Sequence, residues 1–552
     1  MKKFTAILLA VVMLFALSAS AFAATNSLET DYAIGDGLGV SVDLNIEGMY
    51  FDGVDILNTA TNGYYPFSFS LIASDRSKVA SVTVSNGGSF HWAYAQNADG
   101  SYVTDEDGNY VESTTTNYGV VVLPTTSAST VTVTGTGNIG SATFNCAQPN
   151  GGTTAAGAAL YAYLPAPAQF VNEGVTTGGW GDAYDSNGTV KATSSTGVSL
   201  GFFGGYAVYE FENPIADDPT HPYGADFIVY GNAFWNNSEA GCIQVSKDGA
   251  TWYDIAGSMY YTKSTKGATI TYTNPSTSED AGITAAGTNL GTLAPVNYTL
   301  NGTAGTVTTN TFHNHSWFPL NANYFTASGS RAAMAKLDEF SFVSRTLASN
   351  GVTNTLTFTG TLLTDYPGTG KTDQIGFGYC DVHPNKTLGG TIAYNPYQTF
   401  TSSSDYDTKV AGTSGGDPID IAWAVNPDGT PANLDSIRYV RIYTGMAQMN
   451  GIFGEISTEV CGVAACTGTG AGKATTDLVV RRLNQTIPTE NNKAVSVAAG
   501  NFRITSAEEN VYVNGVKVTA SSGYTLNVVA GKSYQIITQS GTEAPYITVL
   551  VG

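Results

Sequence analysis

The sequence predicts an all-β protein made of tandem β-sandwich or jelly-roll domains, with a small immunoglobulin-like sandwich at the C-terminus. Segments that alternate β-branched or aromatic residues with other residues recur along most of the chain, for example Ser129–Gly137 and Asn354–Leu362. Gly and Asn-Gly or Asp-Gly pairs separate many of these segments, as is typical of β-hairpins. Helical periodicity is nearly absent, and only Arg331–Phe340 has a composition that suits a helix as well as other structure.

The first 24 residues are typical of a secretory signal peptide. Lys2 and Lys3 precede an apolar stretch that ends in the small-residue sequence Ala-Phe-Ala, which is the pattern of an export signal. The apolar stretch is too short for a membrane span, so we expect no transmembrane segment. The signal therefore predicts a secreted protein, and we expect it to be associated with the cell surface.

Three units are predicted after the signal. Residues 25–165 are expected to form an N-terminal β-sandwich. Residues 166–478 are expected to form a central jelly-roll-like unit, with an insertion near residues 263–337 that is rich in small polar residues. Residues 479–552 predict the small C-terminal sandwich, in which Asn514-Gly515 favours a type I′ hairpin turn because both positions tolerate a positive φ.

The charge of the chain limits its partners. The sequence has 44 acidic and 23 basic residues, for a formal net charge of −21. Nucleic acids and anionic lipid surfaces would repel such a protein, so we expect no nucleic-acid partner. An acidic surface instead favours solubility and the binding of cations.

Five cysteines are too few for a disulfide scaffold, and their odd number leaves at least one thiol unpaired. Cys461 and Cys466 are close enough in sequence to suggest a local disulfide in an oxidising exterior. Cys242 and Cys380 lie in strand-like segments and are expected to be buried as small hydrophobic residues.

The central unit contains an ordered set of motifs within residues 170–463: GGYAVYEFENPI, DFIVYGNAF, VSKDGATW, FGYCDVHPN, DIAWAVNPDG and GEISTEV. In content and order they resemble a module of exported bacterial cell-surface proteins. The resemblance implies a jelly-roll or galactose-binding-like sandwich at the cell surface, and it transfers no catalytic residue. The chain departs from the usual pattern in a long insertion between Ser258 and Asp338, and at Cys380, where a small residue such as Ala is usual.

A metal site is predicted around one loop of this module. Asp226, Asn232 and Glu239 flank the loop and offer the carboxylate and amide oxygens that Ca²⁺ prefers, which makes calcium the candidate cofactor. The alternative is that Asp226 and Asn232 only bond backbone amides at a corner of the sheet. The acidic segments Thr104–Glu112 and Asn426–Asp435 are better interpreted as hairpin turns than as cation sites.

Three tryptophans are candidates for ligand binding. Trp180, Trp235 and Trp317 occur among loop-type residues, and exposed aromatic rings flanked by amides suit glycans. The alternative for these residues is ordinary loop packing. By contrast, Trp92, Trp252 and Trp423 lie in strand patterns and are expected in the core.

No catalytic residue can be assigned. The chain has no Gly-x-Ser-x-Gly, phosphate-binding or His-Glu-x-x-His motif. Asp381 and His383 are two residues apart and suit a base with its orienting partner, but no nucleophile accompanies them. Acidic pairs that would serve glycoside hydrolysis are available, but chance also produces such pairs in an acidic chain: Asp338-Glu339, Asp417 and Asp420, Glu455 and Glu459.

We therefore expect a non-catalytic binding or adhesion protein of the cell surface or extracellular matrix. Its expected partner is a surface glycan or another surface protein, with calcium as a stabilising ion. Two alternatives remain open at this point. The sandwiches could assemble with one another into a structural surface layer through their strand edges, or the protein could be a secreted polysaccharide hydrolase or lyase.

Overall fold

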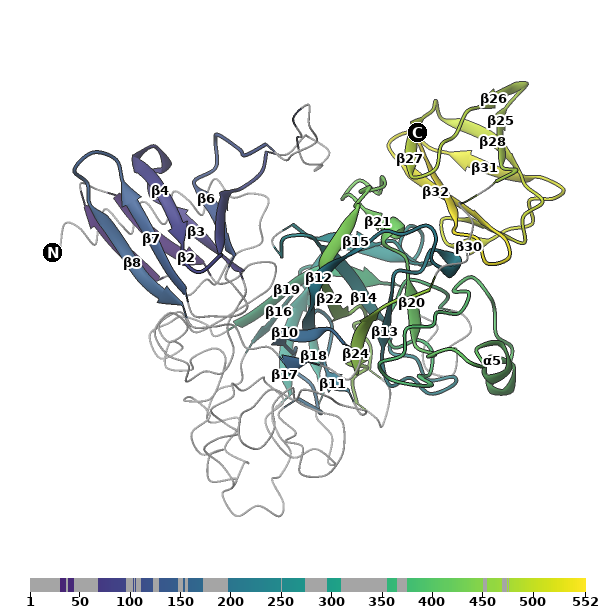
Figure 1. Cartoon of the computed structure of the whole chain (residues 1–552), viewed down its shortest axis with the longest axis horizontal. Helices are drawn as coiled ribbons and strands as arrows, with labels where there is room; N and C mark the ends of the chain where they lie inside the picture. The colour runs from purple at the N-terminus through teal and green to yellow at the C-terminus, as the bar shows by residue number, and fades with distance from the viewer. Residues whose placement is uncertain are drawn as a thin grey trace, which may run out of the picture.

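The computed structural model describes residues 30–35, 38–43, 68–95, 103, 105, 111–122, 129–146, 152–153, 157–171, 197–249, 251–273, 295–308, 355–364, 375–449, 454–468, 474 and 476–552. Strands dominate this part of the chain, and the predicted all-β, multi-domain sandwich fold is confirmed (Figure 1). Every pair of named strands is antiparallel except β27 and β33. Within these residues no helix has the length and apolarity needed to cross a membrane.

The N-terminal unit is a sandwich of two sheets. The first sheet has the order β1 (Thr30–Gly35), β2 (Leu38–Asp43), β3 (Ser68–Ala73), β6 (Tyr118–Val122), β5 (Ser89–Trp92). The second has the order β4 (Val79–Val84), β7 (Ser129–Gly135), β8 (Ser141–Cys146). Buried and half-buried residues alternate along all of β7, as the sequence pattern predicts. Its inward residues Val131 and Val133 form the core together with Leu71 and Val121 of the other sheet.

The central unit is built on a seven-stranded sheet. Its order is β21 (Ala424–Val425), β15 (Tyr253–Ile255), β14 (Gly241–Ser246), β22 (Ser436–Thr444), β12 (Tyr206–Ala216), β10 (Ala159–Leu164), β9 (Gly152–Thr153). The strands β9 and β10 thus belong to the central sheet, whereas the sequence places them before the boundary at residue 165. The reason is that Leu160 and Tyr163 carry enough apolar surface to join the central core, although the segment around them is rich in small residues.

Three smaller sheets share the central core. They are β20 (Asp417–Ile419), β13 (Phe227–Tyr230), β24 (Gly462–Ala465); then β11 (Val198–Ser199), β23 (Glu459–Val460); and then β18 (Thr303–Val307), β17 (Val296–Leu300), β16 (Ser264–Thr273), β19 (Thr355–Leu363). The third of these sheets contains residues that the sequence assigns to an insertion. Ile270 and Tyr272 of β16 are fully buried, and the Tyr272 hydroxyl donates to the carbonyl of Phe203 at 2.7 Å. This part of the insertion is therefore integral to the core.

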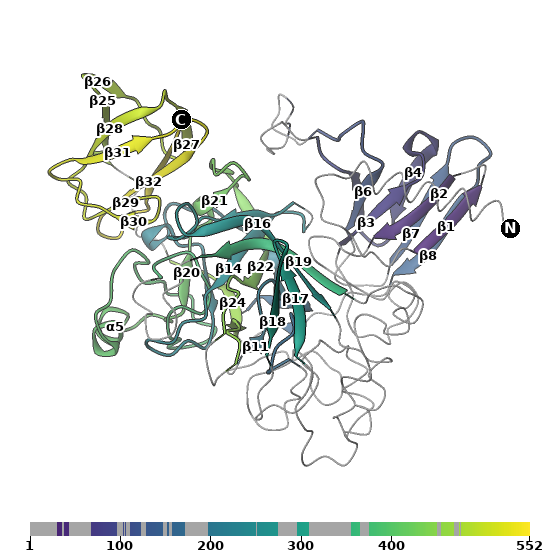
Figure 2. The same cartoon turned by 180° about the vertical axis from the view of Figure 1, so that it is seen from behind.

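The C-terminal unit is a two-sheet sandwich that contacts the central unit (Figure 2). Its sheets are β26 (Gln485–Ile487), β25 (Val479–Arg482), β28 (Gly500–Thr505), β31 (Tyr524–Val528), and β27 (Lys493–Ser496), β33 (Tyr546–Val551), β32 (Ser533–Gln539), β29 (Asn510–Val513), β30 (Val516–Lys517). The predicted type of turn fits the hairpin between β29 and β30, where φ is +50° at Asn514 and +76° at Gly515. The Tyr512 hydroxyl donates to the carbonyl of Tyr397 at 2.8 Å, and its ring lies 5.4 Å from that of Phe377.

The helices in the described residues are short: α5 (Ser403–Lys409), η2 (Arg76–Lys78), η4 (Pro222–Gly224), η9 (Ile421–Trp423). Ser402 caps α5 by accepting the N–H of Asp405 at 3.1 Å. The candidate helix Arg331–Phe340 lies outside the described residues.

The suggested disulfide between Cys461 and Cys466 is wrong, because both thiols are free and buried. The backbone from Cys461 to Cys466 runs extended along β13, so the two Cα atoms, five positions apart, are separated by about 16 Å. A disulfide requires a Cα separation of about 4.4–6.8 Å. Cys242 and Cys380 are also free and buried, as expected from the sequence.

The tryptophans expected in the core differ in burial. Trp423 is fully buried, whereas Trp92 and Trp252 are half-buried and pack against the edge of the core. The guanidinium of Arg76 lies 4.3 Å from the centre of the Trp92 ring, and that of Arg441 lies 4.4 Å from the Trp252 ring. Arginine therefore covers the outer faces that the strand pattern predicts to be buried.

Candidate functional site

One loop of the central unit is closed at its base by a single residue. The loop comprises residues 231–240 and connects β13 to β14. Near its start the N–H of Asn232 donates to Oδ1 of Asp381 at 2.7 Å, and near its end the N–H of Glu239 donates to the carbonyl of Asp381 at 3.0 Å. A Cβ at Gly231 would collide with the Asp381 side chain, so glycine permits this approach.

The position of Asp381 is fixed by its neighbours. Cys380 and Gly241 exchange both backbone hydrogen bonds at 2.9 Å, which sets Asp381 directly beside the loop. Asp381 has a left-handed φ of +61°, a conformation that Asp tolerates better than most residues. The Asp381 side chain also accepts the N–H of Glu459, at 3.0 Å from Oδ2, and thereby connects β23 to the loop.

Three carboxyl groups meet at this point: Glu239, Asp381 and Glu459, called here the loop-base group. One oxygen from each lies within 4.8 Å of the others. Glu459 is held by the Ser457 hydroxyl, which donates to its Oε1 at 2.8 Å, and by side-chain hydrogen bonds with Asn232 and Glu239. Asp381 and Glu459 are buried and Glu239 is half-buried.

Burial and mutual repulsion dominate the electrostatics of the loop-base group. Burial raises the pKa of all three carboxyls, and the negative charges of Glu459 and Asp381 raise the pKa of Glu239 further. Hydrogen bonds from Glu239 and Ser457 partly offset the rise in the pKa of Glu459. In the described part of the chain, no Lys, Arg or His forms an ion pair with any of the three.

A fourth acid, Glu455, interacts electrostatically with the loop-base group. Glu455 is 4% exposed, and its Oε1 accepts the N–H of Gln169 at 3.0 Å. Its Oε2 is buried without a hydrogen-bond partner. Burial, and to a lesser extent the charge of Glu459, raise the pKa of Glu455 to about 8. The charge of Glu455 in turn raises the pKa of Glu239.

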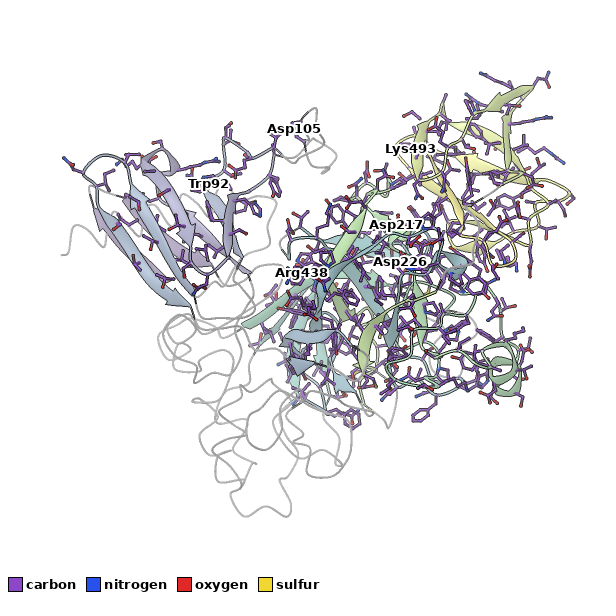
Figure 3. All side chains as sticks on the ribbon, viewed as in Figure 1. Trp92, Asp105, Asp217, Asp226, Arg438 and Lys493 are labelled. Carbon is purple, nitrogen blue, oxygen red and sulfur yellow. The ribbon has the colours of Figure 1, made fainter. Side chains whose placement is uncertain are left out.

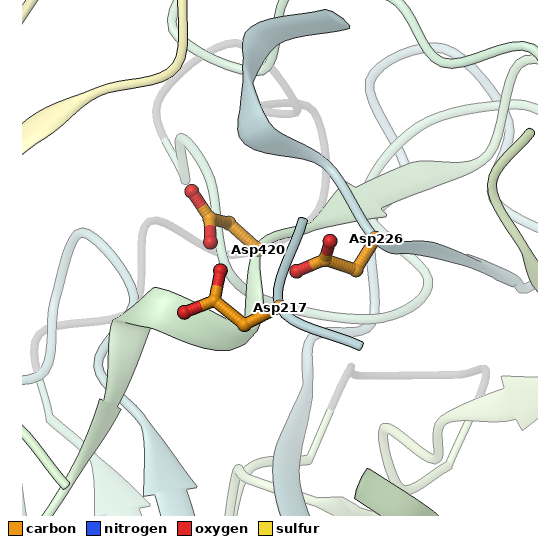
Figure 4. A group of neighbouring side chains, drawn as sticks. All are labelled: Asp217, Asp226 and Asp420. Carbon is orange, nitrogen blue, oxygen red and sulfur yellow. The ribbon is translucent and has the colours of Figure 1, made fainter. Parts of the chain in front are cut away.

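A second acidic group consists of Asp217, Asp226 and Asp420, whose carboxyls point toward one another (Figure 4). Asp226 accepts the N–H of Asp218 at 3.0 Å and that of Ile421 at 2.9 Å, and Asp420 caps η9 by accepting the N–H of Ala422 at 2.7 Å. Asp217 and Asp226 lie on the side of the central unit near the C-terminal sandwich (Figure 3).

Unlike the loop-base group, the second group has a basic neighbour. His221 Nδ1 lies 3.1 Å from Oδ1 of Asp226, and this hydrogen bond raises the pKa of His221. Burial is the main cause that raises the pKa of Asp217 to about 7, and repulsion by Asp226 adds to it. The hydrogen bonds of Asp226 and Asp420 serve to fix backbone, which is the corner role that the sequence leaves open for Asp226.

The predicted metal ligands are thus divided between two groups. Asn232 and Glu239 lie together at the base of the loop, whereas Asp226 belongs to the second group. Asp226 precedes β13 and Asn232 follows it, and four extended residues alone span about 13 Å. The sequence suggests Asp381 only as a partner of His383. An acid between Cys380 and Val382, in an otherwise apolar strand pattern, would also have indicated a functional residue.

The other candidates are placed as follows. Trp235 is half-buried, with its ring 6.1 Å from that of Tyr406 and 6.5 Å from that of Phe400. Its neighbour Phe234 is 58% exposed. Trp180 and Trp317 lie outside the described residues.

The structure pairs His383 with Asp417 rather than with Asp381. His383 Nδ1 lies 2.8 Å from Oδ1 of Asp417, and the imidazole stacks on the Tyr406 ring at 5.7 Å. Asp417 and Asp420 accept hydrogen bonds from different partners, the N–H of Val382 and the N–H of Ala422. Glu455 and Glu459 do interact electrostatically.

No family model and no curated protein matches this chain. The resemblance to a cell-surface module therefore stays a prediction from the sequence motifs.

Proposed function

We propose that this protein is a secreted, non-catalytic binding protein of the cell surface or extracellular matrix that contacts glycans through the 231–240 loop. The observation that carries the proposal is the turn at the tip of this loop. There Phe234 is 58% exposed and lies beside the half-buried Trp235. Sugar rings stack on such aromatic faces, and the flanking side chains of Asn236 and Asn237 offer amide groups for hydroxyls.

The fixed shape of the loop supports a binding role. The N–H of Asn237 donates to the carbonyl of Phe234 at 2.9 Å, and Asn236 takes the left-handed φ of +65° that closes the turn. Below the turn, Trp235 packs on Phe400 and Tyr406. A loop that is already ordered loses less conformational entropy when it binds, which favours affinity.

The use of the acidic residues also supports binding over hydrolysis. Glycoside hydrolysis requires an acid and a second carboxylate on either side of the substrate. Asp381 instead accepts two backbone N–H groups and Glu459 accepts a hydroxyl, so these carboxyls hold the loop and its neighbouring strand together.

A glycan array probed with the full chain, with and without calcium, tests this proposal. We expect binding that Phe234→Ser and Trp235→Ala abolish. Leu483→Ala is the matched control, because Leu483 is 93% exposed but lies on the β25–β26 hairpin of the C-terminal sandwich. Binding to no glycan by a folded protein, or equal binding by all three variants, would refute the proposal.

A further inference from the structure

We infer that the loop-base group of Glu239, Asp381 and Glu459 is a binding site for one divalent cation, with calcium the best match, and that the bound ion holds the 231–240 loop. This inference rests on the proposed function in one respect: the loop that the ion holds is the loop that we propose to bind glycans. The binding of the ion is independent of any glycan.

The geometry suits calcium. Two oxygens that bind one Ca²⁺ at about 2.4 Å can lie at most about 4.8 Å apart. The three carboxyl groups each offer an oxygen within 4.8 Å of the other two. They converge from the loop, from the residue after Cys380 and from β23, so an ion among them would connect three separate segments.

The chemistry of the ligands narrows the choice of ion. All three groups present hard carboxylate oxygens, which favour Ca²⁺, Mg²⁺ or Mn²⁺ over the softer ions that prefer thiolate and imidazole. Ca²⁺ accepts six to eight oxygen ligands in irregular geometry, and Asn232, which bonds Glu459, can contribute an amide oxygen. Glu239 is half-buried, whereas Asp381 and Glu459 are buried, so an ion would enter from the side of Glu239.

An independent observation points to an absent cation. Glu455 is 4% exposed, its Oε2 is buried without a hydrogen-bond partner, its charge acts on Glu239, and the charge of Glu459 acts on Glu455. A buried carboxylate oxygen without a donor is costly unless a positive charge is near. Within the described residues no basic side chain pairs with these four acids, so a cation is the partner that they lack.

The second acidic group is the natural comparison. It has the same number of carboxyls, but His221 is hydrogen-bonded to Asp226, whereas none of the described basic side chains pairs with the loop-base group. Its charge is already partly balanced. It therefore serves as the control for the loop-base group.

The test is isothermal titration of the full chain, freed of metal with EDTA, with CaCl₂ and separately with MgCl₂. We expect one equivalent of Ca²⁺ to bind, with Kd on the order of 10⁻⁷ to 10⁻³ M, the range of calcium sensors and extracellular modules, and weaker binding of Mg²⁺. Glu239→Gln should weaken calcium binding by about tenfold or more, because it removes one of three charged ligands. Asp217→Asn, in the second group, should leave the affinity unchanged.

A second measurement keeps the inference testable if Glu239→Gln folds poorly. Calcium should raise the melting temperature of the wild-type chain and slow proteolysis within residues 231–240. The inference is overturned if calcium gives neither heat nor a thermal shift with the folded wild-type protein, or if Asp217→Asn alone removes binding. Calcium binding without any glycan binding would refute the proposed function and leave this inference standing. Glycan binding without any calcium binding would refute this inference and leave the proposed function standing.

Discussion

Replacement of Glu455 by glutamine should leave the free energy of unfolding nearly unchanged at low pH and should raise it at high pH, relative to the wild type. The Glu455 carboxyl is 4% exposed, its Oε1 accepts a backbone N–H, and burial raises its pKa from 4.5 to about 8. Glutamine keeps the size of the side chain and a carbonyl that can accept the N–H of Gln169. It removes only the ability to ionise.

The sign follows from the protons bound in each state. Between pH 4.5 and pH 8 the folded protein keeps a proton on Glu455, whereas the unfolded chain releases it. The unfolded state binds fewer protons in this window, so the free energy of unfolding falls as pH rises. At 1.36 kcal/mol per pH unit, the rise from 4.5 to about 8 corresponds to a loss of about 5 kcal/mol by pH 9. Glu455→Gln removes this loss.

Urea denaturation in EDTA, followed by tryptophan fluorescence at pH 5 and at pH 8.5, measures the effect. We expect similar stability of variant and wild type at pH 5, and greater stability of the variant at pH 8.5 by about 3–5 kcal/mol. The control is Glu490→Gln, at an exposed position of the C-terminal sandwich, which should follow the wild type at both values. Parallel pH profiles for Glu455→Gln and wild type would refute the reasoning.

Three further predictions concern packing. Gly515→Ala should lower the free energy of unfolding by about 1–3 kcal/mol in calorimetry, because its φ is +76° and a Cβ would collide with the Ser258 backbone. Gly531→Ala is the control, since Gly531 has a similar φ of +71° but lies in open space, and it should lower the free energy of unfolding less. Equal losses in the two variants would contradict the role of the contact with Ser258. Trp423→Phe should cost about 2–4 kcal/mol in urea denaturation, because Trp423 is fully buried and its indole N–H donates to the Tyr397 hydroxyl at 2.8 Å, and a loss below 1 kcal/mol would contradict this. The four described thiols should react with a thiol reagent only on unfolding, and reducing agent should not lower the melting temperature; a decrease would indicate a disulfide.

Local structure was predictable where neighbouring residues determine it. The alternation of β-branched residues in Ser129–Gly135 corresponds to the alternating burial of β7, because successive side chains of a strand point to opposite faces. Asn514 and Gly515 both take the positive φ that a two-residue hairpin requires. The disulfide prediction was wrong because it relied on proximity in sequence alone. The backbone between Cys461 and Cys466 is extended, which keeps the two thiols apart.

The candidate site was only partly predictable, because it is assembled by contacts between distant segments. Asn232 and Glu239 were identified from the composition of their loop. Their partner Asp381 lies 149 residues beyond Asn232, and Glu459 lies 78 residues beyond Asp381. The pairing of β13 with β24 and of Gly241 with Cys380 brings these residues together. Sequence spacing carries no information on such pairings.

The loop-base group suggests why acids rather than an acid–base pair hold the 231–240 loop. A lysine or arginine beside Asp381 would neutralise the buried charge permanently, and the loop would be equally ordered under all conditions. Carboxyls without a basic partner leave that role to an ion, whose occupancy depends on its concentration. Because Asp381 bonds both Asn232 and Glu239, an ion bound there acts on both ends of the loop at once. Under our proposal, calcium would then stabilise the loop that carries Phe234 and Trp235, and would thereby raise the affinity for a glycan.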